Sequence, residues 1–196
     1  MSEPGRDRLL TYADYAVLPD DGQRYQLLEG ELVMTPSPSR WHQGVSRELA
    51  FRLLDFVREH DLGEVYYAPL DVTLDDRNVV QPDILFVSKA RAGILQGSRI
   101  IGAPDLCVEI LSPGTERLDR VRKLELYARF DVTHYWIVDL AARTIEEYVL
   151  AGDVYRVRGV AAYHAPFRPA AFPGFEFRLS VVRLPEGEQA PESERR

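Results

Sequence analysis

Residues 41–60 constrain the fold most, because they form the longest segment with one consistent periodicity. Their apolar side chains recur at i, i+4, i+8 and i+11, which predicts one face of a long amphipathic helix: Val45, Leu49, Leu53 and Phe56. Ser39 stands where the N-cap of this helix is expected. An apolar helical face has to be buried against another element, so the rest of the chain must supply that partner.

The other periodic segments are short and predict strands. Residues 24–28 and 31–35 flank Glu29-Gly30, where the glycine suits the positive φ of a tight hairpin turn. Further strands are expected over residues 64–74, 79–87, 104–111, 133–139, 144–150, 154–157 and 175–181. The fold class is therefore α/β, an α+β arrangement in which helices flank a mixed sheet.

Two more helices complete the predicted secondary structure. Residues 11–18 begin with Thr11 and Asp14 at capping-box spacing, and Thr115 is the expected N-cap of a helix over residues 116–130. The chain has 196 residues with 45% hydrophobic content, and no Pro/Gly/Ser-rich run divides it. We expect one domain over residues 1–184, followed by a polar, disordered tail over residues 185–196.

The composition excludes several classes of protein. Cys107 is the only cysteine, so neither an internal disulfide nor a cysteine-based metal cluster can form, which fits a reducing cytoplasm. The N-terminus is charged and no apolar stretch approaches the roughly 20 residues of a membrane span, so we expect no signal peptide and no membrane partner.

The net charge of −7 argues against binding nucleic acid by broad electrostatic attraction. Residues 185–196 hold four glutamates and two arginines, which accounts for −2 of that charge. A bound metal would neutralise further carboxylates.

Two carboxylates interrupt apolar strands. In residues 79–87, strand alternation places Asp83 on the face opposite Ile84 and Phe86. In residues 104–111, Glu109 shares a face with Cys107 and Leu111. Burying such a group is costly unless it has a partner, and two oxygen ligands completed by waters are typical of Mg²⁺ sites.

A lysine on the following helix fits the same chemistry. Asp119, Lys123 and Tyr127 are spaced by four and lie along one stripe of the predicted helix. Lys123 could orient or deprotonate a water and stabilise charge on phosphoryl oxygens, while a metal polarises the phosphodiester.

In their order and spacing, these residues resemble a known family. The segments that carry the resemblance are Tyr-Gln-Leu-Leu-Glu-Gly-Glu at 25–31, His42 at the start of a helix, Gln-Pro-Asp at 81–83, Ala-Pro-Asp-Leu-Cys-Val-Glu-Ile-Leu-Ser-Pro at 103–113, then Asp119, Lys123 and Tyr127, and His-Tyr-Trp-Ile-Val-Asp at 134–139. Residues 25–139 are similar to the bacterial restriction-endonuclease-type domains of the Uma-two family, within the PD-(D/E)XK nuclease superfamily.

The resemblance implies a restriction-endonuclease-like fold with additional antiparallel strands and a metal-dependent endonuclease that hydrolyses phosphodiester bonds of DNA. It implies that Asp83, Glu109 and the backbone carbonyl of Ile110 bind Mg²⁺ or Mn²⁺. Leu111 stands where the superfamily has its lysine, so Lys123 is assigned that role. Glu31, His42, Asp119 and Tyr127 are expected to support the site.

Other interpretations of the same residues stay open. Asp83 could be a strand-end carboxylate that accepts turn hydrogen bonds, and Glu109 could form a structural salt bridge to Arg120 or Lys123. Lys123 could instead be a solvated lysine paired with Asp119. The chain could then be an inactive nuclease-fold domain that binds nucleic acid or a protein partner, or a purely structural domain. The two-fold symmetry of duplex DNA would suit a homodimer.

Overall fold

The computed structural model describes residues 8–19 and 21–184. Two α-helices longer than five residues frame the described part of the chain, α2 (Arg40–Glu59) and α3 (Leu124–Arg129), and a π-helical segment, η2 (Leu118–Lys123), leads directly into α3. The short elements are α1 (Tyr12–Tyr15), η1 (Lys89–Ile94) and η3 (Leu179–Val181).

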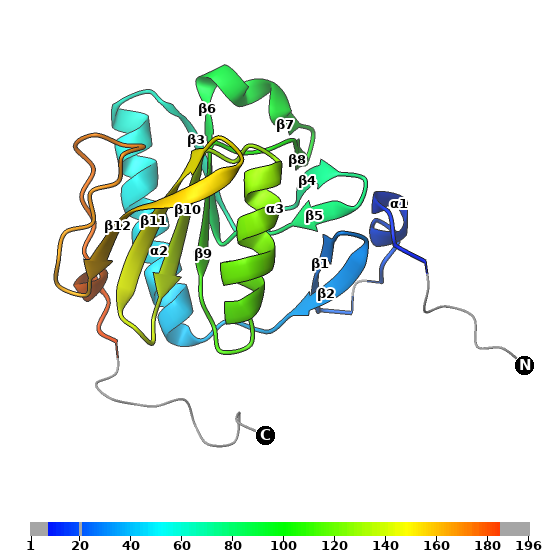
Figure 1. The fold of residues 1–196 in the computed structure, drawn as a ribbon, viewed down its shortest axis with the longest axis horizontal. Coiled ribbons are helices and arrows are strands. Elements are labelled where there is room, and N and C mark those ends of the chain that lie inside the picture. The colour runs from blue at the N-terminus through cyan, green and yellow to red at the C-terminus, as the bar shows by residue number, and fades with distance from the viewer. Residues whose placement is uncertain (1–7, 20, 185–196) are drawn as a thin grey trace, which may run out of the picture.

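The strands form two sheets of six (Figure 1). The central sheet has the order β12-β11-β10-β9-β6-β3, and its strands are β3 (Gly63–Tyr67), β6 (Ile84–Ser88), β9 (Leu106–Ile110), β10 (His134–Asp139), β11 (Thr144–Ala151) and β12 (Val154–Ala162). The second sheet has the order β2-β1-β5-β4-β8-β7, with β1 (Arg24–Leu28), β2 (Glu31–Thr35), β4 (Val72–Asp75), β5 (Asn78–Val80), β7 (Leu95–Gln96) and β8 (Arg99–Ile101). The predicted mixed α/β class is confirmed.

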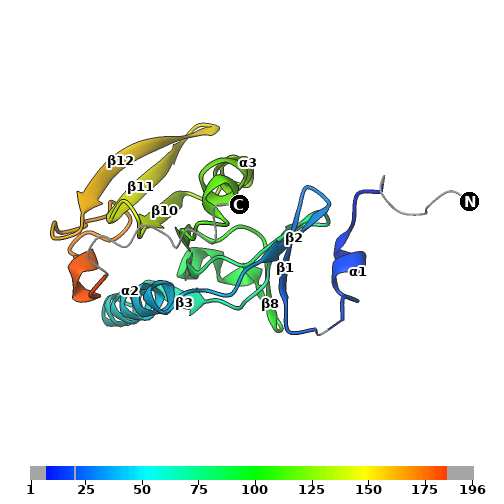
Figure 2. The same ribbon diagram turned by 90° about the horizontal axis from the view of Figure 1, so that it is seen from below.

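The central sheet is covered on both faces, as the two views show (Figures 1 and 2). Helix α2 buries Val45, Leu49 and Leu53 against one face, together with the aromatic side chains of residues 167–177. On the opposite face, α3 and the second sheet share a core with Cys107 and Leu111. Alternate residues of β9 therefore belong to different cores, which is why all five are buried.

Several predicted elements are confirmed by residue range. The hairpin β1–β2 has its predicted bounds, with Glu29 and Gly30 at φ of 54° and 80°. Ser39 caps α2, since its side chain accepts a hydrogen bond from the His42 amide at 3.2 Å. Helix α1 keeps the predicted Thr11–Asp14 capping interaction but is shorter than expected.

Three strand predictions are wrong. Residues 64–74 and 79–87 each divide into two strands that belong to different sheets, β3 and β4 in the first case and β5 and β6 in the second. Alternation cannot reveal this, because an apolar residue is equally suitable for either core. Residues 175–181 form no ladder beyond one bridge from Phe177 to Phe167, since their aromatic rings pack directly on the core.

The predicted helix over residues 116–130 is also modified. The Thr115 carbonyl accepts the first helical bond, from the Asp119 amide, but the Thr115 hydroxyl turns back toward Ser112 and leaves the helix without a side-chain cap there. The π-helical turn over Leu118–Lys123 was not predicted. No helix in residues 8–19 and 21–184 is long and apolar enough to cross a membrane.

Trp136 should make a large contribution to stability through packing, the role that its place in an apolar strand predicts. It is fully buried on β10, and its ring lies 4.9 Å from that of Phe167 in an edge-to-face contact. Trp136→Ala is expected to lower the free energy of unfolding by about 3–5 kcal/mol, because it leaves a cavity. Urea unfolding followed by far-UV circular dichroism measures this, and a loss below about 1 kcal/mol, the level of a surface substitution, would contradict the assignment.

Candidate active site

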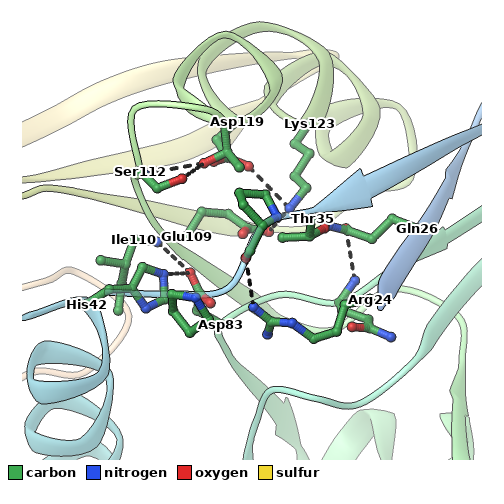
Figure 3. Close-up of a pocket in the computed structure, with 14 residues that line it drawn as sticks. Arg24, Gln26, Thr35, His42, Asp83, Glu109, Ile110, Ser112, Asp119 and Lys123 are labelled. Atoms are coloured by element: carbon green, nitrogen blue, oxygen red, sulfur yellow. Dashed lines mark hydrogen bonds and ion pairs between the residues drawn. The ribbon is translucent and has the colours of Figure 1, made fainter. Parts of the chain in front are cut away.

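One pocket collects the predicted catalytic residues at the ends of several elements (Figure 3). Its walls come from β1, from the link between β2 and α2, from the first turn of α2, from the end of β9 and from η2. The lining residues are Arg24, Gln26, Thr35, Pro36, Pro38, His42, Gln81, Asp83, Glu109, Ile110, Ser112, Thr115, Asp119 and Lys123.

Strand register brings the two predicted acids together. Strands β6 and β9 are antiparallel, and their last pair toward the pocket is Ile84 with Val108. Asp83 precedes Ile84 and Glu109 follows Val108, so the two acids lie opposite each other, one residue beyond that pair. The alternation of residues 79–87 predicts one long strand that contains Asp83. In the structure Asp83 instead lies in the link between β5 and β6.

Asp83 is fixed through one of its two oxygens. Its Oδ2 accepts a hydrogen bond from the Ile110 amide at 2.8 Å and lies 3.1 Å from His42 Nε2. The side chain is 14% exposed, and no hydrogen bond to Oδ1 is present in the part of the chain that the structure describes. The hydrogen-bonded strand-end carboxylate is thus observed, and it leaves one oxygen for a ligand.

Glu109 is held in the same one-sided way. Its Oε1 accepts hydrogen bonds from Lys123 Nζ and from the Tyr127 hydroxyl, both at 2.8 Å. The residue is 4% exposed, and within residues 8–19 and 21–184 no hydrogen bond reaches Oε2. Each acid therefore has one oxygen fixed by the protein and one without a partner in the described part of the chain.

Lys123 is buried, which excludes the solvated lysine. It is 2% exposed, and its ammonium lies 2.8 Å from Glu109 Oε1 and 3.2 Å from Asp119 Oδ1. The π-helical turn over residues 118–123 places Asp119 and Lys123 toward the pocket together. Such turns are frequent at functional sites. The Tyr135 hydroxyl donates to the Asp119 carbonyl at 3.0 Å and supports this turn from the core.

Three carboxylates lie in this cluster, and two of them, Glu109 and Asp119, contact its one ammonium. Burial raises the pKa of the Glu109 carboxyl to about 8, Asp119 and Asp83 act in the same direction, and Lys123 opposes them. Burial alone would lower the pKa of Lys123, but Glu109 and Asp119 outweigh it, so the pKa of the ammonium is raised. Lys123 stays protonated, and at neutral pH Glu109 retains its proton in much of the metal-free protein.

The raised pKa of Glu109 predicts how stability changes with pH. Between the ordinary value of 4.5 and about 8 the folded protein holds a proton that the unfolded chain releases, so ionisation of Glu109 destabilises the fold as the pH rises. Relative to Glu109→Gln, wild type should lose up to about 1.4 kcal/mol of unfolding free energy per pH unit in this window. Urea titrations in EDTA at pH 5, 6, 7 and 8 measure the difference, and a difference independent of pH would contradict the pKa shift.

The other predicted residues divide into two groups. His42, Ile110 and Asp119 line the pocket, and Tyr127 lies behind it on Glu109. Glu31 is outside: its side chain is 63% exposed and pairs with Arg122 at 2.9 Å. Arg120, the other candidate partner of Glu109, instead pairs with Asp139 and Glu146, and Leu111 is buried in the core.

Six polar residues of the pocket were not predicted as site residues: Arg24, Gln26, Thr35, Gln81, Ser112 and Thr115. Gln26 donates to Thr35 Oγ1 at 2.9 Å and accepts from the Gln81 amide at 3.1 Å, which ties β1, β2 and the end of β5 together. Gln26 could have been found, since a glutamine next to the apolar pair Leu27-Leu28 requires hydrogen-bond partners when buried.

The donor set suits a hard divalent cation. Among the described residues, no three His, Cys, Asp or Glu side chains gather closely enough to form an all-protein metal cage. Two carboxylates that each keep one oxygen without a partner, beside the main chain of Ile110, fit Mg²⁺, which retains several of its waters. The buried Nδ1 of His42, in contrast to its Nε2, lacks a hydrogen-bond partner within the described residues.

Comparisons with known proteins identify the fold and the family of the chain. A crystal structure from Anabaena variabilis, described as a putative nuclease belonging to DUF820, superposes with a TM-score of 0.73 over 88% of this chain and 97% of that one, at 19% identity. At that identity the match establishes the fold, which is of the predicted type. No curated protein matches the chain. The family model Uma2, described as "Putative restriction endonuclease", matches residues 12–181, and the chain therefore belongs to that family.

Proposed function

We propose that the protein is a metal-dependent endonuclease that hydrolyses phosphodiester bonds of DNA at the Asp83–Glu109–Lys123 pocket. The observation that carries the proposal is the pairing of two acids from different strands, each with one fixed and one open oxygen, beside a buried lysine. The family, whose description is that of a restriction endonuclease, supports the same class of reaction.

Each residue has a role that follows from its contacts. The open oxygens of Asp83 and Glu109, with the Ile110 carbonyl, would hold Mg²⁺ or Mn²⁺, which when bound polarises the phosphodiester and supplies a coordinated water. Lys123 stays protonated between Glu109 and Asp119, so it acts by stabilising negative charge on the phosphoryl oxygens rather than as a base. His42 orients Asp83 and Tyr127 orients Glu109.

Cleavage of supercoiled plasmid and of circular single-stranded DNA tests the proposal. The purified protein is incubated with Mg²⁺, Mn²⁺ or EDTA, alongside Asp83→Asn. We expect nicking or linearisation of DNA with either metal and none in EDTA or with Asp83→Asn. If wild type leaves both DNAs intact, or if Asp83→Asn cleaves them as fast as wild type, the proposal is wrong and the pocket belongs to a binding module or to a purely structural domain.

A further inference from the structure

The two cations that line the pocket differ in whether a carboxylate pairs with them. Three carboxylates face it, from Asp83, Glu109 and Asp119, and two cations, from Lys123 and Arg24. Lys123 forms ion pairs with Glu109 and Asp119. Arg24, in contrast, has no carboxylate oxygen within 4.0 Å in the described part of the chain. Among the described residues, Arg24 is therefore the pocket cation that no carboxylate pairs with.

The Arg24 side chain is also short of hydrogen-bond acceptors. It stands at the first residue of β1, opposite Thr35 of β2, and extends into the pocket (Figure 3). One terminal nitrogen donates to the Pro36 carbonyl at 3.3 Å. A guanidinium has five N–H donors in a planar fork, so several of them remain for an acceptor in the pocket. Arg24 is half-buried, which restricts where such an acceptor can lie.

We propose that Arg24 binds a phosphate group of the DNA strand through its guanidinium fork, an inference that rests on the proposed function. A polyanion that approaches three carboxylates needs a cation in addition to the catalytic metal and to Lys123, which already pairs with two of those carboxylates. Arginine suits this role because its guanidinium can donate two parallel hydrogen bonds to a phosphate. A merely structural arginine that holds the Pro36 carbonyl would need one donor, a task that lysine could also perform.

The test compares Arg24→Met, Arg24→Lys and the matched control Arg99→Met. Arg99 is also a half-buried arginine of the second sheet without a carboxylate partner among the described residues, but it stacks on Tyr12 outside the pocket. Binding of a fluorescent DNA duplex is measured in Ca²⁺ over a series of NaCl concentrations, and the melting temperature of each variant verifies folding.

For Arg24→Met we expect roughly tenfold weaker binding and a salt slope smaller by about 0.9, the value for one lost phosphate contact. Arg24→Lys should keep the slope but not the full affinity, because lysine carries the charge without the fork. Arg99→Met should match wild type. A further series of duplexes carries one neutral methylphosphonate each, at a different position in each duplex. At one position the methylphosphonate should weaken DNA binding by wild type and leave DNA binding by Arg24→Met unchanged.

Two failures are distinguishable. In the first, wild type cleaves DNA, but Arg24→Met has the same salt slope and the same methylphosphonate profile as wild type. This result would contradict the role of Arg24 and leave the proposed function unaffected. A wild-type protein that neither binds nor cleaves DNA overturns the proposed function and this inference with it.

Discussion

Glu109→Gln is expected to reduce metal-supported DNA cleavage by about 10³-fold or more while the protein stays folded. The neutral amide oxygen binds a hard cation more weakly than a carboxylate does, and metal polarisation supplies several kcal/mol of transition-state stabilisation, at about 1.36 kcal/mol per tenfold in rate. The fold should tolerate the change, because glutamine resembles the protonated form that the raised pKa of Glu109 favours in the metal-free protein. Initial rates of plasmid nicking at saturating Mg²⁺ measure the effect.

The matched control is Glu147→Gln. Glu147 on β11 is also buried, at 3% exposure, and its carboxylate accepts a hydrogen bond from the Ala170 amide at 2.7 Å outside the pocket. Burial raises the pKa of Glu147 as well, so the two substitutions remove comparable groups. Equal rates for the two variants would show that Glu109 contributes to packing and not to catalysis.

Lys123→Met should have the largest effect on stability of any single change in the pocket. It removes the one ammonium that Glu109 and Asp119 share, and breaking a buried ion pair by deleting one partner typically costs about 3–5 kcal/mol. Cleavage should be lost as well, since no other cation lies on Glu109 within the described residues. Urea unfolding at pH 7 in EDTA measures the loss of stability.

A double-mutant cycle separates the ion pair from general packing. Lys123→Met combined with Glu109→Gln should be more stable than the sum of the single effects predicts, because the double variant no longer has at position 109 an ionisable group that Lys123 stabilises in its charged form. Lys89→Met is the surface control: Lys89 pairs with Asp61 while 61% exposed, so its removal should cost at most about 1 kcal/mol. Strict additivity in the cycle would mean that Lys123 and Glu109 are not energetically coupled.

Much of the site could be predicted because its residues are charged and stand in otherwise apolar segments. Glu109 sits between Val108 and Ile110 in an apolar strand, and such a residue demands a cation or a ligand wherever the strand lies. The i, i+4 spacing of Asp119 and Lys123 likewise indicated a shared side of a helix, and they do face the pocket together.

The rest depends on relations between distant segments. The division of residues 64–74 and 79–87 between two sheets is set by which core each half enters, and alternation is the same for both. The π-helical turn over Leu118–Lys123 has no periodic signature of its own in so short a segment. Arg24 looks like an ordinary strand-start charge until the register with Thr35 and the link to α2 close the pocket around it.

The central claim is that Asp83 and Glu109 together hold a divalent cation, and Mn²⁺ binding tests it most directly. Free Mn²⁺ is counted by electron paramagnetic resonance during titration of wild type, Asp83→Asn, Glu109→Gln and the control Glu147→Gln, with Mg²⁺ as competitor. The account predicts Mn²⁺ binding that Mg²⁺ displaces, that both pocket variants lose and that the control retains. Binding of equal strength and stoichiometry in all four proteins would contradict it.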